Sequence, residues 1–344
     1  MGKTRVGLVC GGKSSEHEIS CVSANGVLNA IDRNLFDVEL IGITKTGKWL
    51  YLPSDTAFVV QNGALPSVPE SGIEINITNS GFIAGGKNLA IDVVFPVLHG
   101  PYGEDGTIQG LLEIFDIPYV GSGVLASAVC MDKSYAKSIF TSVGLKVAPG
   151  IVTTSEKFNL PNQLTFPLFV KPARSGSSRG TSKVKDDSEL TNAIKHALEY
   201  DTKVIVEQAV TGKEIECAIL QSAGELKVSA VGQIEIDKKF EFYDFQAKYL
   251  DDSMRLIVPA QLPIAVSNQI QQAAVTAFKA AGCEGLARVD FFYSNTGEII
   301  INEINTMPGF TPTSVYPKLM AELGINYSNL ITKLIKSAFE PLKS

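Results

Sequence analysis

Apolar and polar positions in the first third of the chain follow strand and helix spacing in turn. Short apolar runs typical of buried strands occupy 5–12, 37–44 and 90–100. Apolar residues at helical spacing occupy 14–32 and 106–116. Strands that alternate with helices predict a parallel sheet covered on both faces, so we expect an α/β domain at about 1–125. Residues 45–90 are rich in Gly, Ser and Pro, and no element is assigned there.

The first predicted helix begins with "SSEHE", where a serine is expected as N-cap and acidic residues fill the first turn. A second unit is expected at 126–212, with a helix closed by Gly144, two strands joined by a loop of small residues, a further amphipathic helix and a strand. A third unit at 213–344 has strands, a helix over 263–282, a hairpin around "SNTG" and a closing helix.

The hairpin of the third unit joins "LARVDFFY" to "EIIINEIN". A loop of two or four residues would place Asp290 opposite Ile301 and Arg288 opposite Glu303, whereas a three-residue loop would break this pairing. By the two-residue period of a strand, Arg288, Asp290, Glu303 and Asn305 then share one face. Two carboxylates and an amide oxygen suit Mg²⁺. An exposed face with an Arg–Glu ion pair explains the same pattern.

The second candidate site consists of Lys171 and the loop of small residues that follows it. Lys171 ends an apolar strand, and five of the next nine residues are Gly or Ser. Backbone N–H groups and hydroxyls in such a loop can approach phosphate oxygens, although the GxxxxGK[ST] pattern is absent and a flexible hairpin remains an alternative. Lys133 precedes a predicted helix, and Glu207 and Glu214 flank a glycine turn. Each of these three, taken alone, reads as a surface residue.

Further polar residues lie where strands of the first unit end. Glu16 stands at the start of the first helix, and His99 precedes a glycine-rich loop. Ligands bind at the carboxyl ends of strands in open α/β sheets, although a charge at a helix N-terminus has a structural use of its own. The stretch "FYDFQAKYLDD" contains Lys248 and Tyr249 without a clear period, which fits either a surface loop or a lid over a site.

Composition narrows the class of protein. Hydrophobic residues make up 45% of the chain and the net charge is −6, with no basic stripe, so we expect no nucleic-acid partner. No apolar run approaches the ~18–20 residues needed to span a bilayer, and we expect no membrane partner. The five cysteines include no CxxC pair and the three histidines are widely separated. A reduced, cytoplasmic protein without a zinc or haem site is expected.

The order of the motifs adds a resemblance to a known family. Seven stretches resemble, in sequence and order, the D-alanine–D-alanine ligases of the ATP-grasp superfamily: "GGKSSEHEIS", "HGPYGEDGTIQG", "GSGVLASAVCMDK", "VKPARSGSSRG", "FYDFQAKY", "ARVDFF" and "NEINTMPGFT". The resemblance covers nearly the whole chain and is weakest at 45–90. It implies an α/β fold of three domains, an N-terminal Rossmann-like parallel sheet followed by a two-domain ATP-grasp.

The resemblance also implies an activity. Two D-alanine molecules would be joined through a D-alanyl phosphate, with ATP as the phosphoryl donor, for peptidoglycan synthesis. ATP and two Mg²⁺ (or Mn²⁺) ions are the implied cofactors, D-alanine is the implied small-molecule partner, and a homodimer in the cytoplasm is the implied state. In this reading, Asp290, Glu303 and Asn305 match the metal ligands, with Glu303 bridging two ions, and Lys133 and Lys171 match lysines that bind the ATP phosphates.

Other matches concern the nucleotide and the transition state. Glu207 matches an acid beside the adenine, Glu214 matches an acid that binds the ribose, and Lys248 matches the lid lysine that reaches the transferred phosphate. Arg288 matches an arginine that stabilises the tetrahedral oxyanion together with a backbone N–H near Gly309.

The remaining matches concern the amino-acid substrates. Glu16 matches the carboxylate that holds the ammonium group of the first substrate, and Ser177 and Tyr249 match its hydrogen-bonded partners. Ser314 matches the serine that receives the carboxylate of the second substrate, and His99 lines the first-substrate pocket. Tyr249 favours an amine acceptor, since related D-lactate ligases place another residue there.

Two alternatives remain at this point. One is an ATP-grasp ligase with another acceptor, such as D-lactate or D-serine. The other is a nucleotide-binding sensor that has lost catalysis, which the intact set of catalytic matches disfavours. A dehydrogenase of the Rossmann type is disfavoured because GxGxxG does not follow the first strand.

Overall fold

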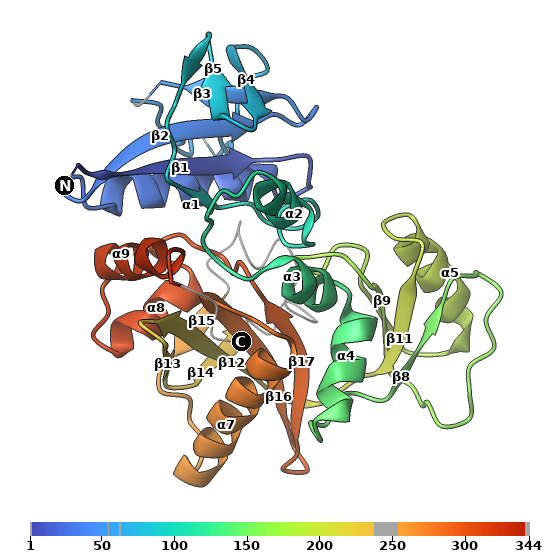
Figure 1. The fold of residues 1–344 in the computed structure, drawn as a ribbon. Coiled ribbons are helices and arrows are strands. Elements are labelled where there is room, and N and C mark those ends of the chain that lie inside the picture. The colour runs from blue at the N-terminus through green and yellow to red at the C-terminus, as the bar shows by residue number, and fades with distance from the viewer. Residues whose placement is uncertain (1, 54, 62, 237–253, 341–344) are drawn as a thin grey trace.

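The strands that the structure describes form three sheets, and helices pack against them. The computed structural model describes residues 2–53, 55–61, 63–236 and 254–340 of the 344-residue chain. Figure 1 shows the sheets as three lobes, with the N-terminal lobe above and the central and C-terminal lobes side by side below it. All described helices and strands therefore fall into an α/β architecture, as the sequence predicts.

The N-terminal lobe contains a seven-stranded sheet with the order β6-β5-β4-β3-β2-β1-β7. Its parallel part is formed by β1 (Thr4–Gly11), β2 (Phe36–Ile43) and β7 (Val93–Pro96). Antiparallel neighbours extend the sheet beyond β2: β3 (Trp49–Leu52), β4 (Ile73–Thr78), β5 (Gly81–Ala84) and β6 (Lys87–Asn88). The parallel strands confirm the prediction for this part of the sheet, and residues 45–90, where no element was assigned, supply an antiparallel edge.

Helices α1 (His17–Ala30) and α2 (Thr107–Ile114) follow strands of this sheet. The expected serine N-cap of α1 is wrong, because Glu16 occupies the N-cap and no side chain caps the helix. The hydroxyl of Ser14 is used differently: it accepts a hydrogen bond from the Glu16 N–H (3.2 Å) and donates one to the carbonyl of His99 (2.6 Å). Ser14 thus joins the turn before α1 to the loop after β7.

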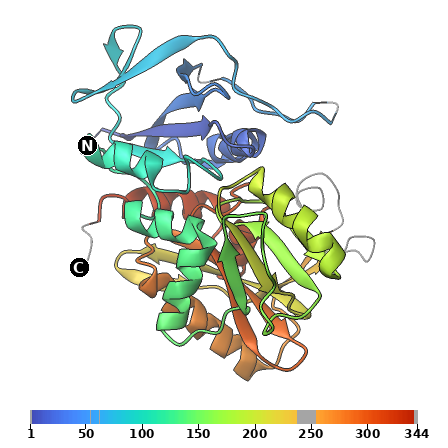
Figure 2. The same ribbon diagram turned by 90° about the vertical axis from the view of Figure 1, so that its right-hand side faces the viewer.

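The central lobe has a four-stranded antiparallel sheet with the order β10-β9-β11-β8. Its strands are β8 (Gly150–Thr153), β9 (Leu168–Pro172), β10 (Ser182–Val184) and β11 (Val204–Gln208). Helix α5 (Asp187–Leu198) buries its apolar face against this sheet, which faces the viewer in Figure 2. Helices α3 (Val124–Met131) and α4 (Lys133–Ser142) precede the sheet, and Gly144 (φ 80°) follows α4 as predicted.

The C-terminal lobe has a six-stranded antiparallel sheet with the order β15-β14-β12-β16-β17, and β13 pairs with β12. The strands are β12 (Gly212–Ser222), β13 (Glu225–Val228), β14 (Gly232–Ile236), β15 (Met254–Ile257), β16 (Leu286–Ser294) and β17 (Ile299–Asn305). Its helices are α7 (Ile264–Ala280), α8 (Val315–Glu322) and α9 (Tyr327–Ser337). One apolar core runs from β1 and α1 into α8 and α9, so the N-terminal lobe is packed on the C-terminal one.

The β16–β17 hairpin corrects the predicted register. Asp290 lies opposite Glu303 and Arg288 lies opposite Asn305, so both predicted pairs are wrong. The N–H of Ser294 bonds to the carbonyl of Glu298 across a three-residue loop, which alone would reverse the faces. A register shift next to Asp290 adds one residue to β17 and restores the alternation.

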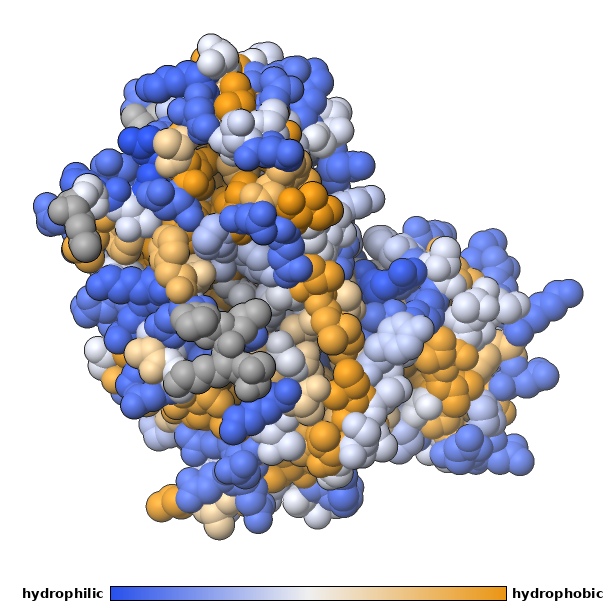
Figure 3. All heavy atoms as spheres, in the orientation of Figure 1, coloured by the Kyte–Doolittle hydropathy of each residue, from blue (hydrophilic) through white to orange (hydrophobic). Residues whose placement is uncertain are grey.

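Figure 3 shows a mixed face, on which hydrophobic side chains gather in several patches, one of them near the middle over α3. Exposed hydrophobic residues of α3 include Leu125, which is 75% exposed. Among the described residues, no helix combines the length and the apolarity that a bilayer crossing requires.

Candidate active site

Two cavities lie where the three lobes meet, and they share one wall. We call them the lysine cavity, of about 400 Å³, and the carboxylate cavity, of about 300 Å³. The lysine cavity lies between the central and C-terminal sheets, and the carboxylate cavity opens toward the N-terminal lobe. The shared wall consists of Lys133, Ser175, Ser177, Glu216, Arg288 and Glu303. A ligand group in one cavity can therefore approach a group bound in the other.

The lysine cavity is built around Glu207, which is buried on β11. Its carboxylate forms ion pairs with Lys171 on β9 (2.5 Å) and with Lys137 on α4 (2.9 Å). Burial alone would raise the pKa of Glu207, but the two ammonium groups outweigh it and lower the pKa to about 2. Lys137 was not predicted, although its position one helical turn after Lys133 puts both on one face of α4.

Lys133 begins α4 and reaches into both cavities. Its ammonium group donates to the carbonyl of Ser175 (2.9 Å) and pairs with Glu303 (3.2 Å). Burial lowers the pKa of Lys171, and the charges of Lys137 and Lys133 lower it further. Lys133 and Lys171 thus repel each other, although each also pairs with a carboxylate, Glu303 and Glu207 respectively. A polyanion bound between the two ammonium groups would offset this repulsion, as the sequence prediction of a phosphate site requires.

The oxygen-rich group on β16 and β17 forms the floor between the cavities. Arg288 donates to both carboxylate oxygens of Asp290 (2.8 and 2.7 Å), and the Asn305 amide donates to the same carboxylate (2.9 Å). These contacts confirm that Arg288, Asp290, Glu303 and Asn305 share a face. A second acid, Glu216 on β12, lies 3.0 Å from the Arg288 guanidinium and was missed by the sequence analysis.

The donor set on this face fits a hard cation. Asp290 and Glu303 stand opposite each other on neighbouring strands, with the amide of Asn305 beside them. Within the described part of the chain, no three His, Cys, Asp or Glu side chains gather closely enough to hold a metal by themselves. Two carboxylates and an amide would therefore leave ligand positions for phosphates and water, which is the usual binding mode of Mg²⁺.

The loop between β9 and β10 crosses from the central lobe to the N-terminal one. The hydroxyl of Ser177 donates a hydrogen bond to the carboxylate of Glu16 at the start of α1. Two residues further on, the guanidinium of Arg179 donates to the carbonyl of Ser15 (3.2 Å). The predicted Glu16–Ser177 pair is thus brought together from positions that are 161 residues apart.

Backbone geometry around this contact explains the small residues of the loop. Ser177 (φ 49°) and Ser178 (φ 57°) both adopt left-handed conformations, which cost energy for residues other than glycine and recur at functional sites. A Cβ atom at Gly176 or at Gly100 would lie 2.6 Å from the Glu16 carboxylate. Glycine at both positions therefore lets two loops close around one carboxylate.

His99 is 4% exposed and lies beside Glu16 in the carboxylate cavity. Its Nδ1 lies 3.1 Å from the carbonyl of Met307, and its Nε2 lies 3.1 Å from the hydroxyl of Ser23. Burial lowers the pKa of His99, and the charge of Glu16 offsets only part of this. A neutral ring that donates from Nδ1 and accepts at Nε2 satisfies both contacts.

Glu104 is a further residue of the carboxylate cavity that the sequence analysis missed. Its carboxylate accepts the N–H of Gly100 (2.7 Å) and the N–H of Met307 (3.3 Å), so it joins the loop after β7 to the turn after β17. Burial and the neighbouring charge of Glu16 raise the pKa of Glu104 to about 8. The sequence offered one indication of this role, because Glu104 lies in the same loop, "HGPYGEDG", as the candidate residue His99.

Comparison with known proteins decides the family. The family described as "D-ala D-ala ligase N-terminus" matches residues 5–122, and the one described as "D-ala D-ala ligase C-terminus" matches residues 139–336. The chain belongs to the D-alanine–D-alanine ligase family. It is 46% identical to the D-alanine–D-alanine ligase of Mycobacterium leprae over 98% of this chain and 94% of the relative. It is 47% identical to that of Rhodococcus erythropolis over 98% and 97%.

Solved structures of this ligase family share the fold. The VanG D-Ala:D-Ser ligase of Enterococcus faecalis has a TM-score of 0.85 and 38% identity, covering 98% of this chain and 100% of that one. A Bacillus anthracis D-alanine–D-alanine ligase complexed with ATP has a TM-score of 0.73 and 28% identity, covering 97% of each chain. The ATP-grasp fold implied by the sequence is thereby confirmed.

The remaining predicted ligase residues are placed as follows. Gly309 and Ser314 line the carboxylate cavity, where a Cβ at position 309 would lie 3.2 Å from the Ser314 hydroxyl. Glu214 lines the lysine cavity. Lys248 and Tyr249 lie outside the described residues.

Proposed function

We propose that the chain joins two D-alanine molecules to D-alanyl-D-alanine, with conversion of ATP to ADP and phosphate. The observation that carries this proposal is the wall shared by the two cavities. Lys133, Arg288 and Glu303 line both the lysine cavity and the carboxylate cavity. A phosphoryl donor and a carboxylate acceptor would thus meet without leaving the protein, which is the positioning that such a transfer needs.

In the first step, an oxygen of the D-alanine carboxylate attacks the γ-phosphorus of ATP. The new O–P bond gives D-alanyl phosphate, and the bond to the β-phosphate oxygen breaks to release ADP. Lys133 and Lys171 bind the phosphates, while Glu16 accepts hydrogen bonds from the ammonium group of D-alanine. Ser177, already bonded to Glu16, fixes this carboxylate. Glu207, Glu214 and Lys248 complete the nucleotide site in this proposal.

Asp290, Glu303 and Asn305 would hold two Mg²⁺ (or Mn²⁺) ions, with Glu303 shared. When bound, these ions would neutralise charge on the phosphates. For this to occur, the Asp290 carboxylate must share its oxygens between the cation and the two donors that contact it now, Arg288 and Asn305. The presence of Arg288 at this carboxylate keeps a positive charge next to the acyl carbon.

In the second step, the amine of the second D-alanine loses a proton and attacks the acyl carbon. The C–N bond forms through a tetrahedral oxyanion, and the C–O bond to phosphate then breaks. Arg288 and the N–H near Gly309 stabilise the oxyanion, and Ser314 receives the carboxylate of the attacking molecule. His99 shapes the first-substrate site as a neutral side chain, and Tyr249 completes it.

We further propose a division of the chain into a substrate domain at 1–125 and two ATP-grasp subdomains at 126–212 and 213–344. The separate sheets of the three lobes support these boundaries. A cytoplasmic homodimer that acts in peptidoglycan precursor synthesis is proposed from the family.

Phosphate release tests the proposal. Wild-type protein is incubated with ATP, Mg²⁺ and a panel of D- and L-amino acids, with D-lactate and D-serine as competing acceptors over a pH series. We expect release with D-alanine and a dipeptide as product. Stimulation by L-alanine alone, or preferred use of D-lactate at neutral pH, would contradict the proposal, since an amine acceptor gains from higher pH and a hydroxyl acceptor does not.

Acceptor choice gives a separate prediction for Tyr249→Phe. Loss of the hydroxyl should shift the competition toward D-lactate, measured as the ratio of depsipeptide to dipeptide at one pH. An unchanged ratio would show that Tyr249 does not set the preference.

A further inference from the structure

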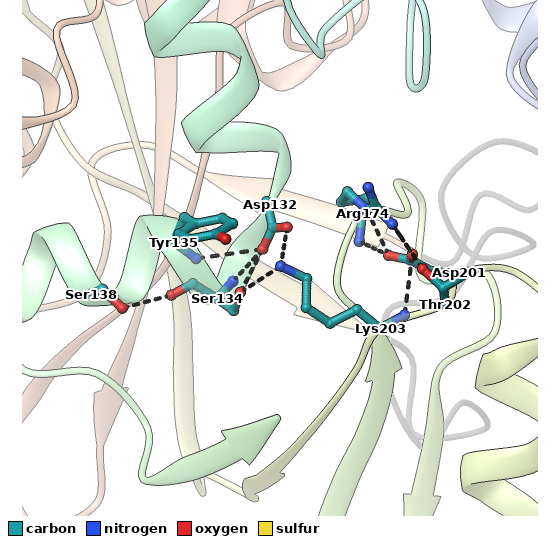
Figure 4. A network of polar contacts seen from close by, with 8 residues as sticks. All are labelled: Asp132, Ser134, Tyr135, Ser138, Arg174, Asp201, Thr202 and Lys203. Carbon is teal, nitrogen blue, oxygen red and sulfur yellow. Dashed lines mark hydrogen bonds and ion pairs between the residues drawn. The ribbon is translucent and has the colours of Figure 1, made fainter. Parts of the chain in front are cut away.

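Two ion pairs lie behind the lysine cavity, and the residues that form them line neither cavity. Figure 4 shows the pairs Asp132–Lys203 and Arg174–Asp201 as one connected network. Asp132 precedes α4, Arg174 follows β9, and Asp201 and Lys203 precede β11. The network thus connects the three elements that carry the lysines and the glutamate of the lysine cavity.

The first pair fixes the beginning of α4. The carboxylate of Asp132 caps the helix by accepting the N–H groups of Ser134 (3.0 Å) and Tyr135 (3.4 Å), and it pairs with the ammonium group of Lys203. Lys203 also donates to the Ser134 hydroxyl (3.0 Å) and lies 4.3 Å from the centre of the Tyr135 ring. Within the part of the chain that the structure describes, these contacts of the ammonium group are all with the first turn of α4 or its cap.

The second pair fixes the start of the β9–β10 loop. Asp201 accepts the backbone N–H of Arg174 (2.8 Å) and two contacts from its guanidinium group (3.2 and 2.5 Å). The same guanidinium donates to the hydroxyl of Thr202 (3.2 Å). Arg174 is therefore held through its main chain and its side chain, and the carbonyl of the next residue, Ser175, is held with it.

Both pairs converge on Lys133. Its backbone N–H donates to the carbonyl of Ala173 (3.0 Å), and the N–H of Ala173 donates to the carbonyl of Lys203 (2.9 Å). Its ammonium group donates to the carbonyl of Ser175, next to Arg174 (2.9 Å). The Asp132–Lys203 pair thus holds the main chain of Lys133, and the Arg174–Asp201 pair holds the acceptor of its side chain.

We propose that Asp132, Lys203, Arg174 and Asp201 are positioning residues that aim the Lys133 ammonium group at the phosphates of ATP. This inference rests on the proposed function in that it takes Lys133 as a phosphate-binding residue. Lys203 itself does not bind the nucleotide, because its donors are directed to α4 and it lines neither cavity. Loss of either pair leaves the residues that line the cavity unchanged. Loss of the Asp132–Lys203 pair would release the main chain of Lys133, and loss of the Arg174–Asp201 pair would release the acceptor of its side chain.

The test compares Lys203→Met and Asp132→Asn with wild-type protein. Asparagine caps a helix as well as aspartate does, so Asp132→Asn removes the charge pair and keeps the cap. We expect the KM for ATP to rise about tenfold, which is the effect of losing one charged contact. Calorimetry in the presence of Mg²⁺ should show the same rise in the dissociation constant of adenylyl imidodiphosphate from the protein. The KM for D-alanine should change less than the KM for ATP.

Two further variants separate positioning from general stability. Lys203→Arg retains a cation opposite Asp132 and should recover most of the ATP affinity. Lys146→Met removes the exposed Lys146–Glu298 pair (2.8 Å), which lies away from both cavities, and should leave both KM values unchanged. Because Arg174→Met acts on the same lysine, its effect combined with Lys203→Met should be smaller than the product of the two single effects.

The outcomes decide between this inference and the proposed function. Wild-type protein that releases phosphate with D-alanine, together with unchanged nucleotide affinity in folded Lys203→Met and Asp132→Asn, overturns the positioning role alone. Equal rises in both KM values, or a rise in Lys146→Met, also overturn it, because they indicate a general loss of structure. Wild-type protein without D-alanine-dependent phosphate release overturns the proposed function, while calorimetry still reports on the network.

Discussion

Glu207→Gln is the substitution from which we expect the largest loss of stability in the site. Glutamine keeps the size of the side chain but removes the charge that balances Lys137 and Lys171. Glu207 is 4% exposed, so water cannot replace the lost charge. Breaking a buried ion pair from one side leaves uncompensated charge, and such changes typically cost about 3–5 kcal/mol.

The pKa of Glu207 gives the size of this loss of stability for this protein. It lies at about 2 in the folded chain against an ordinary value of 4.5. At roughly 1.4 kcal/mol per pH unit, this difference corresponds to about 3 kcal/mol of stability. Because the folded-state pKa is the lower one, the contribution is complete above pH 4.5 and is lost as the pH falls toward 2. At neutral pH the whole contribution is therefore present and would be removed by the substitution.

Urea unfolding at pH 7 measures this loss. We expect the free energy of unfolding of Glu207→Gln to fall by about 3 kcal/mol with an unchanged dependence on urea concentration. The control is Glu298→Gln, which removes the same charge from an exposed pair with Lys146 and should leave the urea midpoint unchanged. A loss below about 1 kcal/mol in Glu207→Gln would refute the reasoning, because that is the range of exposed ion pairs.

Two further predictions concern Glu303, in the shared wall, and Glu104, in the carboxylate cavity. Glu303→Gln should abolish phosphate release, since it removes one of the two opposed carboxylates that would hold the metal. The far-UV circular dichroism spectrum should stay unchanged. Substantial D-alanine-dependent turnover by this variant would contradict the metal assignment. Glu104→Gln should change how stability depends on pH. The folded-state pKa of Glu104 is raised to about 8 from 4.5, so between these values the unfolded chain releases a proton that the folded chain keeps, and stability falls as the pH rises. Urea midpoints at several pH values should show this fall in wild-type protein and a weaker one in the variant; parallel curves would contradict it.

The shared face of β16 and β17 shows how a correct prediction can follow from a wrong register. The two-residue period put Arg288, Asp290, Glu303 and Asn305 together, but the paired residues were wrong because the loop has three residues. The added residue in β17 repaired the alternation. A sequence does not reveal such a bulge, because the chain distributes strand twist and loop strain only when the sheet forms.

Side chains that depend on tertiary contacts were the ones that sequence reasoning missed. Glu104 occurs in a stretch that was already selected, whereas Lys137 and Glu216 do not. Each of the three looks like an ordinary surface charge in the sequence. Their roles depend on partners far along the chain, such as Met307 for Glu104 and Arg288 for Glu216. Burial gives these contacts their strength, and burial is a property of the assembled lobes.

The arrangement of the lobes explains why the site depends on the β9–β10 loop. The N-terminal and C-terminal lobes share one apolar core, and a Cβ on Gly26 of α1 would lie 2.9 Å from Pro312. Glu16 and Arg288 therefore belong to one packed body, whereas Ser177 reaches Glu16 from the central sheet. The β9–β10 loop therefore closes the central lobe onto this body, in addition to the packing of α4 against the C-terminal sheet. The left-handed serines at 177 and 178 are the local cost of that closure, and the contacts of Ser177 with Glu16 and of Arg179 with Ser15 offset it.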